Sequence, residues 1–253
     1  MNHPCELQAV VVGSDRSVID SVMPCLEQLG IALSVYAQPA SAVQTLKREK
    51  IDAFFVDRDL DPELSVLKGM RSSPSNRSAV GFAIAPRQAA QTETFRIADF
   101  VIEKPVSTMS VGRTVRAAYG IMLKERKRYF RHSVGIPVEL TDSSYRRFVG
   151  QSINISQTGI AVALATQLGA RETVQLEFHL PNMGEKLSCK AQIIWTAEQG
   201  KTGLSFTQMN PVDRQRLTAW IEEEFHRLWE MPAGNASAVR VDAINRAAPI
   251  RNH

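Results

Sequence analysis

The stretch Lys124-Glu125-Arg126-Lys127-Arg128-Tyr129-Phe130-Arg131 lies where the hydrophobic pattern of the chain changes. Short apolar runs alternate with amphipathic segments before it, whereas extended segments separated by turn-forming residues follow it. The first pattern is typical of a parallel sheet with helices on both faces, and the second is typical of an all-β domain. The basic stretch is therefore expected to contain the boundary between two domains, close to Glu125.

Five buried strands are predicted in the first domain, which spans residues 1–123. They are Ala9–Val12, Ala32–Tyr36, Asp52–Val56, Val80–Ala85 and Phe100–Ile102. Between the strands, Ser41 is expected to cap one helix and Pro62 to open another. This alternation of strand and helix predicts a parallel sheet covered by helices on both faces.

The second domain, residues 124–230, is predicted to contain six strands and a final helix. The strands are Val134–Leu140, Phe148–Ile155, Gly159–Ala165, Thr173–Leu180, Lys186–Trp195 and Gly203–Phe206. The helix is expected to begin at Pro211 and to carry an apolar stripe. That stripe includes Val212, Leu217, Trp220, Ile221, Phe225, Leu228 and Trp229. It is expected to cover a barrel mouth or to pair with a second subunit, which makes a homodimer a candidate assembly. Residues 231–253 lack any period and are predicted to form a flexible tail.

Composition limits the class of protein. The chain has 253 residues, is 44% hydrophobic, and contains three cysteines without metal-ligand spacing. An odd, scattered set of cysteines indicates a reducing compartment and neither a disulfide framework nor a zinc site. No apolar run approaches the roughly 18 residues that span a membrane, and residues 1–6 lack the order of a secretion signal. We therefore expect a cytoplasmic protein without membrane insertion.

The charge of the chain is concentrated in the basic stretch. Residues 124–131 hold five cationic side chains against one glutamate, a net charge of +4 that equals the formal charge of the whole chain. Duplex DNA would need cations spread over a wide face, whereas a small phosphorylated ligand needs a few guanidinium groups in one place. DNA is therefore not an expected partner. His132 adjoins the stretch without a recognisable nucleophile or acid, so no catalytic residue, metal or cofactor is predicted and the chain is not expected to be an enzyme.

A second polar motif, Asn154-Ile155-Ser156-Gln157-Thr158-Gly159, follows the basic stretch. On an extended chain the side chains of Asn154 and Ser156 point to the same face. Gly159 is expected to take the positive φ that strains other residues. The motif can offer oxygen acceptors to a base edge while arginines reach phosphates. Taken singly, the basic stretch can also be a solvated linker, and the motif a turn with local side-chain hydrogen bonds.

Together, the two motifs resemble the signature of the PilZ family of cyclic di-GMP receptors. That signature is an Arg-Arg-x-x-x-Arg loop followed by Asp/Asn-x-Ser-x-x-Gly. The resemblance covers roughly residues 124–230, and Ile194-Trp195 and Gly203–Phe206 resemble the last barrel strands of the family. It implies a six-stranded β-barrel with a C-terminal helix, preceded by a basic loop, and cyclic di-GMP as the ligand.

The resemblance also implies a set of ligand contacts. They are Arg126, Lys127, Arg128, Arg131, Asn154, Ser156 and Gly159. Lys127 departs from the family pattern, since a lysine keeps the charge but lacks the planar fork and the stacking surface of arginine. Arg128 is the candidate replacement.

Residues 7–123 resemble the response-regulator receiver domain, which has a flavodoxin-like fold. The resemblance is carried by the five-strand alternation, by Asp57 at the end of the third strand and by Lys104-Pro105 after the fifth. In that family, an acidic pair after the first strand helps the phosphorylated Asp to hold Mg²⁺. Gly13 and Ser14 occupy the corresponding positions here, and Asp15 is displaced.

The receiver-like domain is therefore expected not to be phosphorylated. The hydroxyl residue expected after the fourth strand is also replaced, within Ile84-Ala85-Pro86. Asp57 and Lys104 are then a vestigial phosphoacceptor pair, retained as a structural ion pair.

Three hypotheses follow for the whole chain. In the leading one, cyclic di-GMP orders the interdomain loop and reorients the two domains. In the second, the barrel is a degenerate scaffold that binds protein partners without nucleotide. In the third, phosphorylation of Asp57 gates a signalling output. The sequence names no downstream protein partner for any of them.

Overall fold

The computed structural model describes residues 5–87, 94–166, 168–169, 171–230 and 240–241. These residues form two compact units, with the division between Arg126 and Lys127. The division falls inside the basic stretch. Each unit is described separately below.

The first unit is built on a parallel sheet in the order β12-β2-β1-β3-β4-β5. The strands are β1 (Gln8–Val12), β2 (Ala32–Tyr36), β3 (Ala53–Asp57), β4 (Val80–Pro86), β5 (Phe100–Lys104) and β12 (Arg240–Val241). The order β2-β1-β3-β4-β5 is the flavodoxin-like one, so the predicted fold class is confirmed. β12 falls in the segment predicted to be a flexible tail, and residues 231–239 and 242–253 of that segment lie outside the described residues.

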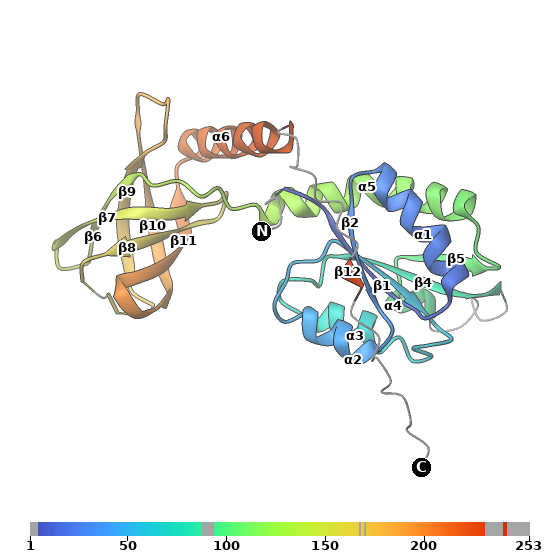
Figure 1. Cartoon of the computed structure of the whole chain (residues 1–253). Helices are drawn as coiled ribbons and strands as arrows, with labels where there is room; N and C mark the ends of the chain where they lie inside the picture. Colours follow the sequence, from blue (N-terminus) through green and yellow to red (C-terminus); the bar gives the residue numbers. More distant parts are fainter. Residues whose placement is uncertain (1–4, 88–93, 167, 170, 231–239, 242–253) are drawn as a thin grey trace, which may run out of the picture. The chain divides into compact units, whose positions relative to one another are not determined.

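Helices cover both faces of this sheet. They are α1 (Arg16–Gln28), α2 (Pro39–Thr45), α3 (Ser65–Ser72), α4 (Thr94–Ile97) and α5 (Thr108–Tyr129). Figure 1 shows α1 and α5 on one face and α2 and α3 on the other. On the second face, Ala42 and Leu67 belong to one buried apolar cluster with Val10 and Phe54 of the strands. The central strands β1, β3 and β4 are buried along nearly their whole length and are mostly apolar, because both faces of the sheet are covered there.

Two predicted helix starts were wrong. α2 begins at Pro39, two residues before Ser41, because proline at the first helical position is already fixed at a helical φ. α3 begins at Ser65 and not near Pro62, because the Asp61 carboxylate accepts hydrogen bonds from the N–H groups of Ser65 (2.9 Å) and the next residue (3.0 Å). The capping side chain therefore sets where this helix starts.

The second unit is a closed antiparallel barrel in the order β10-β11-β8-β7-β6-β9. The strands are β6 (Pro137–Thr141), β7 (Arg147–Ile155), β8 (Gly159–Leu164), β9 (Thr173–His179), β10 (Lys186–Thr196) and β11 (Lys201–Met209), with a short 3₁₀ helix η2 (Glu198–Gly200) between the last two. Helix α6 (Pro211–Glu230) begins at the predicted proline and buries Leu217, Trp220, Ile221 and Phe225. The six-stranded barrel and its C-terminal helix are confirmed, although Val212 of the predicted stripe is 56% exposed.

The expected basic loop is a helix. Residues 124–129 form the last turns of α5, and only Phe130 and Arg131 separate this helix from the bridge at His132. The loop prediction was wrong because lysine, arginine and glutamate favour helix, and cations near a helix C-terminus complement its dipole. The helix also continues a buried stripe at three- and four-residue spacing, formed by Val111, Val115, Ala118, Met122 and Arg126.

All three cysteines lie in described segments, are buried, and form no disulfide. Burial raises the pKa of Cys5 to about 11 and that of Cys189 to about 12. At neutral pH they are therefore thiols that pack as small apolar side chains. Within the described ranges, no helix is both long enough and apolar enough to cross a membrane.

Candidate functional site

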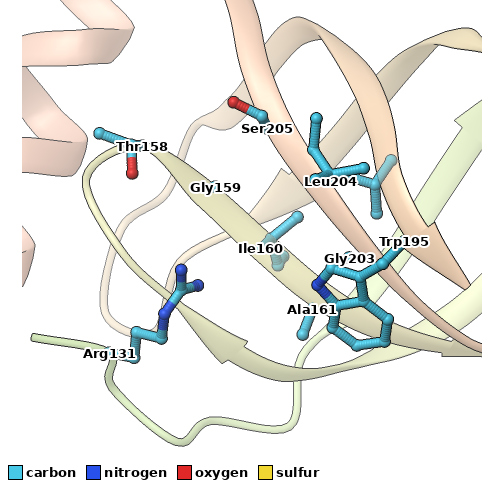
Figure 2. Close-up of a pocket in the computed structure, with 10 residues that line it drawn as sticks. Arg131, Thr158, Gly159, Ile160, Ala161, Trp195, Gly203, Leu204 and Ser205 are labelled. Atoms are coloured by element: carbon cyan, nitrogen blue, oxygen red, sulfur yellow. The ribbon is translucent and has the colours of Figure 1, made fainter. Parts of the chain in front are cut away.

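A pocket of about 400 Å³ lies on the barrel (Figure 2). It is lined by Arg131, Thr158, Gly159, Ile160, Ala161, Ile194, Trp195, Gly203, Leu204 and Ser205. The lining comes from the neighbouring strands β8, β11 and β10, from the turn before β8, and from the segment that follows α5. In Figure 2, Arg131 lies to one side of the β8 residues that line the pocket, and Trp195 lies next to Ala161 and Gly203.

The backbone of Arg131 is held by its two neighbours. Phe130 is 4% exposed and packs edge-on against Phe225 of α6, with 5.2 Å between ring centroids. The N–H of His132 donates to the carbonyl of Ile155 (2.8 Å), and the N–H of Ile155 donates back (2.9 Å). The Arg131 side chain is exposed and pairs with no described residue. Its guanidinium therefore offers its donors to a ligand in the pocket.

Gly159 allows two strands to approach closely. A Cβ on Gly159 would lie 2.4 Å from the carbonyl oxygen of Leu204 in β11, a distance that real side chains do not tolerate. Among the described glycines, positive φ occurs at Gly30 and Gly200. The prediction that Gly159 takes a positive φ was therefore wrong. The second motif needs glycine here because β11 leaves no room for a side chain.

Ser156 shapes the turn that precedes β8. It is 3% exposed, and its hydroxyl donates to the carbonyl of Gly159 (3.1 Å) and accepts from the N–H of Thr158 (3.3 Å). The turn is fixed further by the hydrogen bond from the Phe206 N–H to the Thr158 carbonyl (2.9 Å). These local bonds place Thr158 and Gly159 at the pocket, while the Ser156 hydroxyl itself is engaged within the turn.

Asn154 carries a buried acceptor beside the pocket. It pairs in register with Ala161, a lining residue, at a point where the β7–β8 register shifts. Its side-chain oxygen Oδ1 is buried and accepts no hydrogen bond from any described residue. A buried carbonyl without a partner costs about 1–3 kcal/mol, which a ligand donor could recover.

The remaining predicted cations do not line this pocket. Arg126 is 9% exposed and lies in the first unit, with Nη1 3.4 Å from Oδ2 of Asp52. The Nζ atom of Lys127 is 3.2 Å from Nε2 of His226 and lies 5.4 Å from the ring centroid of Phe225. Arg128 is exposed on the last turn of α5. The pocket thus brings together Arg131 and Gly159, with Ser156 and Asn154 next to them.

Trp195 is the main lining residue that the sequence did not identify as a ligand contact. It is paired in register with Gly203, and a Cβ on Gly203 would lie 2.2 Å from the indole ring. The indole therefore lies over the bare backbone of Gly203 and remains 45% exposed. The sequence does contain a tryptophan at the end of one predicted strand and a glycine at the start of the next. Whether the two residues pair depends on the strand register, which the sequence did not give.

His132 is a packing residue in this conformation. Its side chain is 12% exposed, its ring contacts Trp220 edge-on at 5.3 Å, and its Nε2 is 3.5 Å from Oε2 of Glu224. Burial lowers the pKa of His132, against the opposing effect of Glu224, so the ring is neutral at pH 7. Its place next to Arg131 helps to hold the backbone there.

In the first unit, Asp57 and Lys104 form an ion pair at the end of the sheet. The Lys104 ammonium lies 2.7 Å from Oδ1 of Asp57 and 2.7 Å from Oδ2 of Asp59. The displaced acid, Asp15, accepts hydrogen bonds from the N–H and the hydroxyl of Ser17 (both 2.8 Å) and so caps α1. These bonds with Ser17 lower the pKa of Asp15.

The glycine that replaces one acid of the receiver pair is close to the aspartate. A Cβ on Gly13 would lie 3.5 Å from the Cβ of Asp57, so Gly13 leaves that side of Asp57 without a carboxylate. Within the described segments, no group of three or more His, Cys, Asp or Glu side chains is arranged to hold a metal ion. Lys104 is thus the charged side chain that pairs with Asp57 among the described residues.

Residues 125–223 match the family model for the PilZ domain. This stretch, from the end of α5 into α6, is called the PilZ domain below. No curated protein matches the chain.

Solved structures resemble each unit. The inhibitor of motility MotI/DgrA of Bacillus subtilis has 21% identity over 38% of this chain and 50% of that chain, with a TM-score of 0.35. The PilZ domain of CeSA from a cellulose-synthesizing bacterium has 23% identity over 37% of this chain and 96% of that chain, with a TM-score of 0.32. A CheY-like receiver domain from Methylobacillus flagellatus has 22% identity over 44% of this chain and 98% of that chain, with a TM-score of 0.39.

Proposed function

We propose that the PilZ domain binds cyclic di-GMP and that the chain is a non-enzymatic receptor for this messenger. The observation that carries the proposal is that the guanidinium of Arg131, which pairs with no described residue, lines the same pocket as the Gly159 turn. Two motifs that are far apart in sequence supply these two walls. The pocket volume of about 400 Å³ lies within the usual range for small-ligand sites.

Arg131 and Trp195 in the pocket, and Asn154 beside it, each suit one part of the ligand. Arg131 can pair bidentately with a phosphate or with the acceptors on the Hoogsteen edge of guanine. The unpaired Oδ1 of Asn154 can accept a hydrogen bond from a guanine N–H group. The exposed indole of Trp195 offers a flat surface on which a purine can stack.

Ligand binding would act on the end of α5 and not on a flexible loop. The helix runs to Tyr129, and Arg131 follows only two residues later. Drawing Arg131 toward a phosphate therefore pulls on the last turn of the helix that joins the two units. Through this helix, ligand binding would reorient the two domains. Ordering or melting a segment is a known switching device.

A scaffold without nucleotide is the second candidate, and one observation favours it. Arg126 and Lys127, the positions of the paired arginines in the family signature, contact Asp52 and His226 instead of the pocket. In that case both units would serve to bind proteins. Titration with cyclic di-GMP separates the two candidates, since the scaffold shows no saturable binding.

The Trp195→Ala variant tests the stacking surface. Loss of one base-stacking contact costs about 1–3 kcal/mol, so cyclic di-GMP should bind about 5- to 150-fold more weakly. Trp195→Phe keeps an aromatic face and should retain most of the affinity. Calorimetry that gave the same Kd for the wild-type chain and for Trp195→Ala would remove Trp195 from the site.

The third hypothesis, phosphorylation of Asp57, predicts a mass increment that we do not expect. Lys104 neutralises Asp57, and Gly13 supplies no carboxylate for Mg²⁺. Treatment with acetyl phosphate and Mg²⁺, followed by mass spectrometry, should leave Asp57 unmodified. A phosphoryl adduct on Asp57 in the wild-type chain would show the receiver-like unit to be active. The double variant Gly13→Asp, Ser14→Asp restores the acidic pair and serves as the comparison.

A further inference from the structure

Asp52 is a buried carboxylate immediately before β3, and it contacts Arg126 near the end of α5. Its side chain is fully buried, and its Oδ2 atom accepts a hydrogen bond from the N–H of Gln8 (2.9 Å). The guanidinium of Arg126 approaches the same oxygen at 3.4 Å and the carbonyl of Lys50 at 3.5 Å. The Lys50 ammonium lies 3.8 Å from Oδ1. These contacts hold the Arg126 side chain within the first unit.

This buried pair is incompletely satisfied. Charge-assisted hydrogen bonds are usually about 2.7–2.9 Å long, and the contact between Arg126 and Asp52 is longer. Oδ1 of Asp52 and Nε of Arg126 are buried without a hydrogen-bond partner among the described residues. Burial raises the pKa of Asp52 and lowers that of Lys50, in both cases as the largest effect. A buried ion pair of this kind gains little net stability from its own attraction.

The boundary between the units falls within the basic stretch 124–131, which resembles the first motif of the PilZ signature. Arg126, at its first position, belongs to the first unit, whereas Lys127 belongs to the second and contacts α6. Arg131 is one and a half helical turns further along the chain, beyond the end of α5. While it is paired with the buried Asp52, Arg126 is only 9% exposed and its guanidinium is not available to a ligand.

We infer that Asp52 competes with the nucleotide for Arg126, so that the Asp52–Arg126 pair is a latch that lowers affinity for cyclic di-GMP and couples binding to the receiver-like unit. The inference rests on the proposed function. A ligand that binds only the open latch has an apparent Kd equal to its intrinsic Kd divided by the fraction of molecules in which the latch is open. By linkage, any event in the first unit that weakens the pair strengthens binding in the PilZ domain.

The test compares Asp52→Asn with the wild-type full-length chain by calorimetric titration with cyclic di-GMP. Asparagine keeps an acceptor for the Gln8 N–H but loses the charge that holds Arg126, so binding should tighten by about 10-fold. Asp59→Asn, an exposed carboxylate in the same unit, is the matched control and should leave Kd unchanged. In an Arg126→Gln background, Asp52→Asn should leave the Kd unchanged, because the guanidinium for which Asp52 competes is absent.

The outcomes separate the latch from the proposed function. Binding by Asp52→Asn that is tighter than wild type only when Arg126 is present supports the latch, even if the wild-type chain binds too weakly to measure. An unchanged Kd in Asp52→Asn, or the same gain in the Arg126→Gln background, overturns it while leaving the receptor function intact. Absence of binding in every variant removes both proposals.

If the Asp52→Asn variant does not fold, hydrogen exchange of the wild-type chain tests the latch instead. Hydrogen exchange of the wild-type chain should show faster exchange of the amides from Arg126 to Tyr129 when cyclic di-GMP is added, because the end of α5 is released. Unchanged or slower exchange in bound protein would contradict the latch.

Discussion

Arg131→Ala is expected to weaken the binding of cyclic di-GMP by about 100-fold or more. The side chain lines the pocket, is exposed and has no described partner, so the ligand is the group it can pair with. Two charge-assisted hydrogen bonds to a phosphate, at about 1.5–3 kcal/mol each, account for a loss of this size. Because the guanidinium pairs with no other residue in the described part of the chain, the free energy of unfolding should stay within about 0.5 kcal/mol of the wild type.

Arg147→Ala is the control for this variant. Arg147 is an exposed arginine at the start of β7 that does not line the pocket, so its removal changes the net charge equally. We expect calorimetry to show nearly wild-type affinity for Arg147→Ala. Equal affinities for Arg131→Ala and the wild-type chain would contradict the assignment of the site.

Gly159→Ala is expected to destabilise the barrel by about 3 kcal/mol or more, at the upper end of the usual overpacking effect. The added methyl carbon would lie 2.4 Å from a backbone oxygen of β11, which cannot rotate away as a side chain could. Strands β8 and β11 would have to separate, and the ligand pocket lies over both. Affinity for cyclic di-GMP should fall together with stability.

Gly184→Ala provides the matched comparison. Gly184 lies between β9 and β10, and a Cβ there meets no atom within 4 Å. Its substitution should be neutral or slightly stabilising, since alanine restricts the unfolded chain. Chemical denaturation followed by tryptophan fluorescence reports on the barrel unit, because all three tryptophans (Trp195, Trp220 and Trp229) belong to it. Similar unfolding midpoints for the two alanine variants would show that β8 can move away from β11.

Hydrophobic periodicity predicted the architecture well, because each unit has one clear pattern. Buried parallel strands are continuous apolar runs, and Ala32–Tyr36 was predicted with the bounds that β2 has. The barrel strands alternate, and their predicted positions overlap all six observed strands. The sequence did not predict that α5 continues to Tyr129. A run of charged residues occurs both in exposed helices and in linkers, so composition does not distinguish them. The buried position of Arg126, four residues after Met122, decides for the helix.

The candidate site was less accessible to sequence reasoning, since it depends on contacts between strands. Arg131 and Gly159 could be identified as candidates because both lie in the motifs that resemble the PilZ signature. Trp195 could not, because its position over Gly203 follows from the β10–β11 register. The partner of Arg126 was equally hidden, since Asp52 lies far from it in sequence and was predicted only as the first residue of a strand.

The central claim is that the PilZ domain is a cyclic di-GMP receptor. Titration of the purified full-length chain with cyclic di-GMP, followed by calorimetry and by amide chemical shifts, tests it most directly, with GMP as the control ligand. We predict saturable binding, with shift changes at Arg131, at Gly159 and near Trp195, and no comparable response to GMP. The absence of heat and of any shift change at high micromolar cyclic di-GMP would contradict the claim and favour the protein scaffold.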